Sequence, residues 1–206
     1  MTAGLHQRIK AAISSGQPVL IVVAGSNGAG KTTFYYRALE QIGLPFINAD
    51  EIAKGLAQAD TATGNYEAMR LAETIREDLL ARRESFVIET VLSDTQGAKL
   101  NFFERAQASG YLFVFIHIVL ANAELSALRV MQRVLDGGHD VPDDKLVARF
   151  PRTRENAAKA LAIADQGFVI DNSSLEAPYR LTEVWIQGSP ADHPHPSKSA
   201  RKSRRK

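Results

Sequence analysis

The sequence predicts a three-layer α/β fold, in which helices cover both faces of a mostly parallel central sheet. Apolar, β-branched runs of strand length alternate with amphipathic runs of helix length along most of the chain. A glycine-rich segment directly follows the first strand, and sheets of this kind bind ligands at the carboxyl ends of their strands. The 206 residues are enough for one such domain and too few for two large ones. We therefore expect a single domain over residues 1–188.

The first predicted elements lie on either side of the glycine-rich segment. Residues 5–15 have the pattern of a short amphipathic helix that leads into the first strand. Residues 18–24 form an apolar, β-branched run, which is typical of a strand buried on both faces of a parallel sheet. Residues 33–42 then predict a helix that ends at Gly43.

A short strand, a short helix and a long helix come next. Residues 45–48 predict the strand and residues 51–56 the short helix. Residues 58–65 are small and polar, so we expect a loop there. Apolar residues recur every three or four positions in residues 66–83, which predicts the long helix, and residues 85–90 predict a strand.

The same alternation continues in the second half of the chain, where glycines end two of the helices. The first predicted strand of this half is the most hydrophobic of the whole sequence. The predicted strands span residues 111–120, 167–171 and 179–187, and the predicted helices span residues 95–109, 122–135 and 143–164, the last interrupted at Pro151.

The glycine-rich segment over residues 25–32 matches the phosphate-binding pattern G-x-x-x-x-G-K-[ST] completely. Glycines let the backbone N–H groups point at phosphate oxygens, Lys31 can reach the outer phosphates, and the Thr32 hydroxyl can bind Mg²⁺. A glycine-rich turn that binds nothing is the alternative, but the strand before it and the helix after it favour a P-loop NTPase fold. The predicted nucleotide-binding residues are Gly25, Ser26, Asn27, Gly28, Ala29, Gly30, Lys31, Thr32 and Thr33.

Two acidic residues lie at or just beyond the ends of predicted strands. Asp50 could accept the proton of a substrate hydroxyl, or it could cap the helix that follows, and the sequence does not decide between these. Glu89 closes an apolar strand, where P-loop proteins place the carboxylate that holds Mg²⁺ or its water. The alternative for Glu89 is a polar residue that merely ends a buried strand. A buried carboxylate without a partner is costly, so we favour the functional interpretation.

Arginines gather on both sides of residues 136–142, which include two glycines and His139. They suit phosphoryl transfer, where the oxygens of the transferred group need neutralising, although most surface arginines are only solvated. His139 is a candidate for substrate contact or a structural loop residue. No cluster has the spacing of a zinc site, so the only metal implied is Mg²⁺ carried with the nucleotide. The arginines are Arg129, Arg133, Arg149, Arg152 and Arg154.

The composition excludes several classes of protein. With 45% hydrophobic and 23% charged residues it is that of an ordinary soluble protein. No run is apolar enough to span a bilayer, the N-terminus lacks a secretory signal, and there is no cysteine for disulfides or thiolate sites. We expect a cytoplasmic protein with no membrane partner.

The charge is unevenly distributed. Residues 198–206 hold six of the 25 basic residues and no acid, which leaves 19 basic against 23 acidic residues elsewhere. The domain is therefore mildly acidic, which argues against a nucleic-acid-binding face. We expect residues 189–206 to be a disordered basic tail, through which any contact with nucleic acid would be weak.

Taken together, these motifs resemble the zeta toxin family of P-loop kinases over residues 19–172. The segment Gly137-Gly-His-Asp-Val-Pro142, followed by Arg149-Phe-Pro-Arg152, is more specific to that family than the phosphate-binding pattern is. The matching segments cover residues 24–33, 48–50, 88–90, 129–133, 137–142 and 149–156.

The resemblance implies a kinase that uses ATP and Mg²⁺ to phosphorylate a hydroxyl group, which in well-known members is the sugar 3′-hydroxyl of UDP-N-acetylglucosamine. It also implies a protein antitoxin as a partner. An ATPase that acts as a switch and a nucleotide-holding module that binds a partner are the alternatives, and an acid and arginines placed for an acceptor favour the kinase. By this resemblance the catalytic residues are Lys31, Asp50, Arg133 and Arg149, the substrate residues are Asp50, Glu89, Thr90 and His139, and the metal ligands are Thr32 and Glu89.

Overall fold

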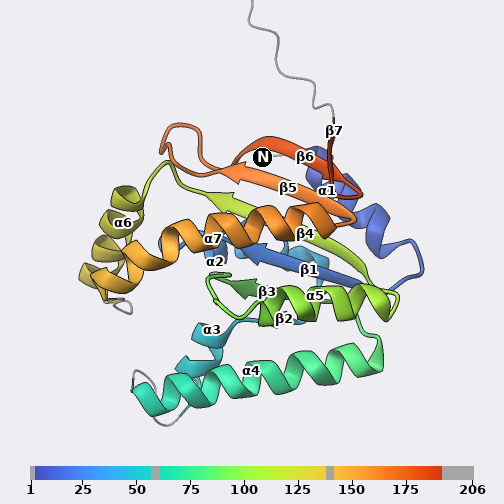
Figure 1. The fold of residues 1–206 in the computed structure, drawn as a ribbon, viewed down its shortest axis with the longest axis horizontal. Coiled ribbons are helices and arrows are strands. Elements are labelled where there is room, and N and C mark those ends of the chain that lie inside the picture. The colour runs from blue at the N-terminus through green and yellow to red at the C-terminus, as the bar shows by residue number, and fades with distance from the viewer. Residues whose placement is uncertain (1–2, 57–60, 138–141, 192–206) are drawn as a thin grey trace, which may run out of the picture.

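A computed structural model describes residues 3–56, 61–137 and 142–191 of the chain. Its seven strands form one sheet in the order β2-β3-β1-β4-β5-β6-β7, with helices on both faces, which confirms the predicted α/β class (Figure 1). The strands are β1 (Val19–Ala24), β2 (Phe46–Ile47), β3 (Phe86–Thr90), β4 (Leu112–Val119), β5 (Gln166–Asp171), β6 (Arg180–Ile186) and β7 (Ser189–Ala191). The helices are α1 (Ala3–Ile13), α2 (Lys31–Ala38), the 3₁₀ helix η1 (Glu40–Ile42), α3 (Ala49–Lys54), α4 (Ala62–Arg82), α5 (Ala98–Ala108), α6 (Ala123–Leu135) and α7 (Asp143–Ile163).

The central strand β1 pairs in parallel with β3 on one side and β4 on the other. Every residue of β1 is buried, as expected for a strand covered on both faces. One core lies between the sheet and helices α4, α5 and α7, and the second lies between the sheet and helices α1 and α2. In the parallel register Glu89 is level with Val23, and Thr90 and His117 are level with Ala24. Side chains from three neighbouring strands therefore meet at the carboxyl edge of the sheet.

The predicted helix over residues 143–164 is continuous, so the interruption expected at Pro151 is wrong. Proline cannot donate a hydrogen bond to the carbonyl of Val147, which lies one turn earlier. Both residues are exposed, so solvent can satisfy that carbonyl and the helix continues. The loop predicted over residues 58–65 is shorter than expected, because Thr61 accepts a hydrogen bond from Gly64 N and caps α4 at Ala62.

The sheet also extends beyond its predicted end. Residues 189–206 were expected to be disordered, whereas Ser189–Ala191 form β7 and pair with β6. Gln187 and Gly188 both have positive φ, which is the two-residue turn that suits the twist of an antiparallel hairpin. Residues 192–206 lie outside the described part of the chain. Within the described residues, no helix has both the length and the apolar character needed to cross a bilayer.

Candidate active site

The loop between β1 and α2 can be formed only by glycine at several positions. A Cβ atom at Gly25 would lie 2.4 Å from the carbonyl oxygen of Ile118 in the neighbouring strand β4. Gly28 has a φ of +69°, and a Cβ atom there would lie 2.8 Å from the carbonyl oxygen of Ser126. The Ser126 hydroxyl donates a 2.7 Å hydrogen bond to Asn27 O. Helix α6 therefore contacts the loop so closely that larger residues would displace one or the other.

Two buried side chains from the far end of the sheet support the other half of the loop. Asn172, which directly follows β5, donates from Nδ2 to Ala29 O at 2.9 Å. Tyr179 donates from its hydroxyl to Gly30 O, also at 2.9 Å. Burial raises the pKa of the Tyr179 hydroxyl, which keeps it protonated and able to donate. Both donors bind carbonyl groups of the loop, so neither occupies the loop N–H groups that a phosphate needs. Of those N–H groups, Gly25 N and Ala29 N donate to Thr90 O and Ser26 O.

We expect Asn172→Ala to lower the free energy of unfolding by about 1–3 kcal/mol, because the Ala29 carbonyl would remain buried without its donor. Urea denaturation followed by circular dichroism measures this change. Asn122→Ala is the comparison variant. It removes an exposed cap of helix α6 and should report less about the loop than Asn172→Ala does. A neutral Asn172→Ala variant would show that the loop does not depend on this hydrogen bond.

The side chain of Glu89, at the tip of β3, connects the loop to β2. The Thr32 hydroxyl lies 3.1 Å and 2.9 Å from the two Glu89 carboxylate oxygens. Asn48 donates from Nδ2 to Oε2 of the same carboxylate at 2.9 Å. The Lys31 ammonium lies 3.8 Å from Oε1 and donates to Ser26 O at 3.1 Å. The structure thus brings together Lys31, Thr32 and Glu89, three of the predicted site residues.

The charged side chains around Glu89 are poorly solvated, since those of Lys31 and Glu89 are each only 8% exposed. Burial lowers the pKa of Lys31, and the Glu89 carboxylate partly offsets this. Burial raises the pKa of Glu89, and the Lys31 ammonium and the Thr32 hydroxyl partly offset it. An anion on Lys31 and a cation on Glu89 would each favour the charged form, so the site suits both a phosphate and a metal ion.

Asp50 is not the cap of helix α3, so the structural alternative for this residue is wrong. The cap is Asn48, whose Oδ1 accepts hydrogen bonds from Asp50 N at 2.8 Å and Glu51 N at 3.4 Å. The Asp50 side chain is exposed in the first turn of α3. Its charge raises the pKa of both Lys31 and Glu89, which places it beside the buried group.

The predicted arginines fall into separate groups. Arg133 on α6 is close enough to Lys31 to lower the pKa of that ammonium. Arg149 on α7 acts on Lys99 instead, farther along the carboxyl edge. Arg129 packs against the loop, since a Cβ atom at Gly28 would lie 3.1 Å from that of Arg129. His139 lies outside the described residues.

Thr90 holds the turn that follows β3. Its hydroxyl oxygen accepts a 3.1 Å hydrogen bond from Leu92 N, and Leu92 has a φ of +57°. Asn156 on α7 donates from Nδ2 to Leu92 O at 3.1 Å and to Asp94 O at 2.9 Å. The left-handed conformation of a buried leucine is unfavourable by itself, so these bonds hold it in place.

A cavity of about 380 Å³ opens beside this turn, between helices α4 and α5 and the end of β3. Figure 1 shows these two helices running side by side along the sheet. Ile88 and Phe102 of the core line the cavity, together with Asp94 from the turn and Lys99 from α5. Burial lowers the pKa of Lys99, and the nearby Asp94 carboxylate partly offsets this.

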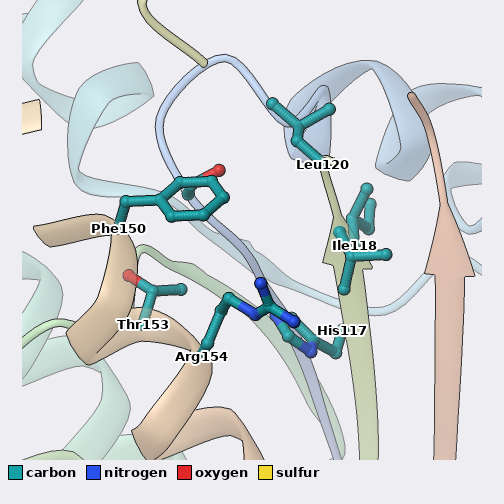
Figure 2. A pocket seen from close by; sticks show the side chains of 8 residues that line it. His117, Ile118, Leu120, Phe150, Thr153 and Arg154 are labelled. Atoms are coloured by element: carbon teal, nitrogen blue, oxygen red, sulfur yellow. The ribbon is translucent and has the colours of Figure 1, made fainter. Parts of the chain in front are cut away.

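A much smaller cavity, of about 10 Å³, lies behind the loop (Figure 2). Figure 2 shows Arg154 and Phe150 of α7 facing His117 and Leu120 across it. The Ser26 hydroxyl also lines it and has no hydrogen-bond partner within the described part of the chain. His117 is buried within strand β4. Burial, together with the nearby Arg154 charge, lowers its pKa to about 4, so the ring is neutral at pH 7.

The lowered pKa of His117 predicts that the protein loses stability as the pH falls from about 6.5 to about 4. In this interval the unfolded chain binds a proton at His117 and the folded chain does not. Over the whole interval the loss from this group amounts to about 3 kcal/mol. Comparing urea unfolding of the wild type and His117→Gln at pH 4.5 and pH 7 measures it. An equal difference between the two proteins at both pH values would contradict the prediction.

The sequence did not identify the residues that support the loop from a distance, namely Ser126, Asn172 and Tyr179. One signal was available for Asn172, because it follows a strand at the ligand-binding edge of the sheet. Asn48 could have been identified by the same signal, because it directly follows β2 and lies two residues before Asp50. The sequence contains no comparable signal for Asp94 and Lys99, which have the appearance of surface residues.

Comparison with known proteins gives a family model and a set of solved structures. The model described as Zeta toxin matches residues 3–180. No curated protein sequence matches the chain. The AvrRxo1-ORF1:-ORF2 complex with ATP is similar, with a TM-score of 0.69 and 19% identity, covering 91% of this chain and 68% of that one. A structure of the PezAT chromosomal toxin–antitoxin system of Streptococcus pneumoniae has a TM-score of 0.59 and 18% identity, covering 81% and 75%. At these identities the likeness concerns the fold.

Proposed function

Because this chain belongs to the zeta toxin family of P-loop kinases, we propose that it transfers the γ-phosphate of ATP to a hydroxyl group of a small molecule. The observation that carries the proposal is the group around Glu89, where the loop lysine, the loop threonine and the end of β2 meet. Asp50 lies at the same edge of the sheet. Because the cap of α3 is Asn48, capping does not account for Asp50. An acid placed beside a phosphate-binding loop suits transfer to an acceptor.

We assign nucleotide binding to residues 25–33, with Lys31 on the outer phosphates. The Thr32 hydroxyl and the Glu89 carboxylate lie within 3.1 Å of each other and fit Mg²⁺, which takes oxygen ligands and usually binds through one or two side chains plus phosphates. The ion would neutralise charge on the transferred phosphate.

In the proposed reaction the acceptor oxygen forms a bond to the γ-phosphorus as the bond to the β-phosphate oxygen breaks. Asp50 orients the acceptor hydroxyl and takes its proton. Lys31, Arg133 and Arg149 neutralise the oxygens of the transferred group. Glu89, Thr90 and His139 are the remaining residues that we assign to the acceptor side. By resemblance to the family we propose a sugar nucleotide such as UDP-N-acetylglucosamine as the acceptor.

A protein antitoxin is a proposed partner. It is supported by the family and by the likeness to PezAT, whose structure is described as a toxin–antitoxin system. Co-purification of the chain with the product of a neighbouring gene would test it, and inhibition of phosphoryl transfer by that product is the expected result.

Product analysis tests the kinase proposal. The purified protein is incubated with γ-labelled ATP, Mg²⁺ and a panel of hydroxyl compounds, and the products are separated and counted. We expect the label in an acceptor, in an amount equal to the ADP formed. Free phosphate alone, in every reaction, would instead indicate an ATPase that acts as a switch.

A further inference from the structure

The small cavity behind the phosphate-binding loop has the size and the lining of a site for one water molecule. Its volume is about 10 Å³, which is about the space that a single buried water needs. A buried water also needs about two to four polar partners. Polar side chains line this cavity from the loop, from β4 and from α7, namely Ser26, His117, Thr153 and Arg154.

The Ser26 side chain is the observation that points to a ligand. Ser26 is only 7% exposed, and its buried hydroxyl oxygen has no hydrogen-bond partner among the described residues. Buried hydroxyl groups without a partner are rare in folded proteins, because each one loses its hydration without compensation. A water in the cavity would supply the missing hydrogen bond.

His117 and the two residues from α7 provide the other partners. The buried His117 ring makes no hydrogen bond with any described residue, and because it is neutral it can donate from one nitrogen and accept at the other. The Thr153 hydroxyl can only accept here, since it donates to Val91 O at 2.9 Å. The Arg154 guanidinium, which Figure 2 shows beside the His117 ring, can only donate. Water matches this mixture of donors and acceptors, whereas an ion would match only one kind.

Ser26 also binds the lysine that we assign to the outer phosphates. Its carbonyl oxygen accepts a hydrogen bond from the Lys31 ammonium at 3.1 Å and one from Ala29 N at 3.2 Å. A Ser26 side chain that is held by a water therefore also holds the carbonyl group that positions Lys31.

We propose that one water molecule occupies this cavity and joins the Ser26 hydroxyl to the His117 ring, which makes Ser26 and His117 positioning residues for Lys31. The proposal rests on the proposed function, because it deepens the assignment of Lys31 to the phosphates of the nucleotide. Both side chains would act through Lys31, and neither needs to touch the nucleotide.

A crystal structure of the wild type at high resolution, with and without a non-hydrolysable ATP analogue, tests the site directly. We expect one water within about 2.7–3.2 Å of Ser26 Oγ and of a His117 ring nitrogen. An empty cavity, a cavity filled by a side chain, or a peak that scatters as an ion would overturn the inference. This experiment needs no variant, so the test stands even where a substitution prevents folding.

A double-mutant cycle tests the positioning role through the affinity for the ATP analogue, which calorimetric titration measures. Ser26→Ala and His117→Phe each remove one partner of the water, and each should weaken binding about 3- to 10-fold. The double variant should bind no more weakly than the single variants, because the same bridge is lost only once. His117→Gln keeps a hydrogen-bonding side chain and should restore most of the affinity.

Ser126→Ala is the matched control, since the Ser126 hydroxyl also holds the loop but does not line this cavity. Its effect on affinity should add to that of His117→Phe. Additive effects of Ser26→Ala and His117→Phe, wild-type affinity of Ser26→Ala, or no binding of the analogue by any of these proteins would overturn the positioning role. So would variants that lower only the free energy of unfolding, measured with urea. Failure of the kinase proposal is seen separately, as a bound analogue and a bridging water without transfer to any acceptor.

Discussion

Lys31→Ala is expected to lower the rate of phosphoryl transfer by about a thousandfold or more. The change removes the cation that lies in the loop 3.1 Å from Ser26 O and 3.8 Å from Glu89. Charge develops on the transferred group in a buried site, where a fixed cation is worth far more than in water. Steady-state assays with labelled ATP measure the loss, and circular dichroism with urea unfolding shows whether the fold persists.

Lys54→Ala provides the control for a lost lysine, because Lys54 lies on α3 with an exposed side chain and, among the described residues, pairs only with Glu51. We expect its turnover to equal that of the wild type. Near-normal turnover of a folded Lys31→Ala protein would contradict the assignment of the loop as the phosphate site.

Asp50→Asn is expected to leave the affinity for ATP unchanged and to lower phosphoryl transfer by about 10²–10⁴-fold. Asparagine has nearly the same size, and the cap of α3 is Asn48, so the helix should not be affected. Only the ability to take a proton from the acceptor is lost. Binding of an ATP analogue by calorimetry and transfer rates at saturating acceptor separate the two quantities.

The neighbouring substitution Glu51→Gln removes a carboxylate from the same turn of α3 and is the matched control, for which we expect a change of less than a few-fold. If Asp50→Asn retains transfer within a few-fold of the wild type, Asp50 is not the base, and the catalytic base must be sought elsewhere on the carboxyl edge.

The fold was predictable because its signals are local. The uninterrupted apolar run of β1, the glycines of the loop and the strong pattern of α4 are each contained within a few turns of chain. The errors lie where local and tertiary effects differ. Pro151 is tolerated because the preceding turn faces solvent. Strand β7 forms because Gln187 and Gly188 adopt a tight turn, which these two residue types alone do not predict.

Of the candidate site, only the group around Glu89 was predictable from the sequence. Lys31, Thr32 and Glu89 come from adjoining strand ends, so topology alone brings them together. The hydrogen bond from Tyr179 to Gly30 O joins residues 149 positions apart, and no short-range pattern reports such a contact. Lys99 has the appearance of a solvated helix residue in the sequence, whereas it lines a cavity that exists only once α4 and α5 have packed.

Helix α7 contacts both the turn beside the larger cavity and the space behind the phosphate-binding loop. Thr153 donates to Val91 O in the turn beside the larger cavity, while the next residue, Arg154, lines the small space behind the phosphate-binding loop. Because α7 contacts both regions, a ligand in one of them that displaces this helix would also act on the other. Any factor by which one ligand changes the affinity of the other must be the same in both directions. Calorimetric titration of an ATP analogue with the larger cavity empty and occupied measures that factor.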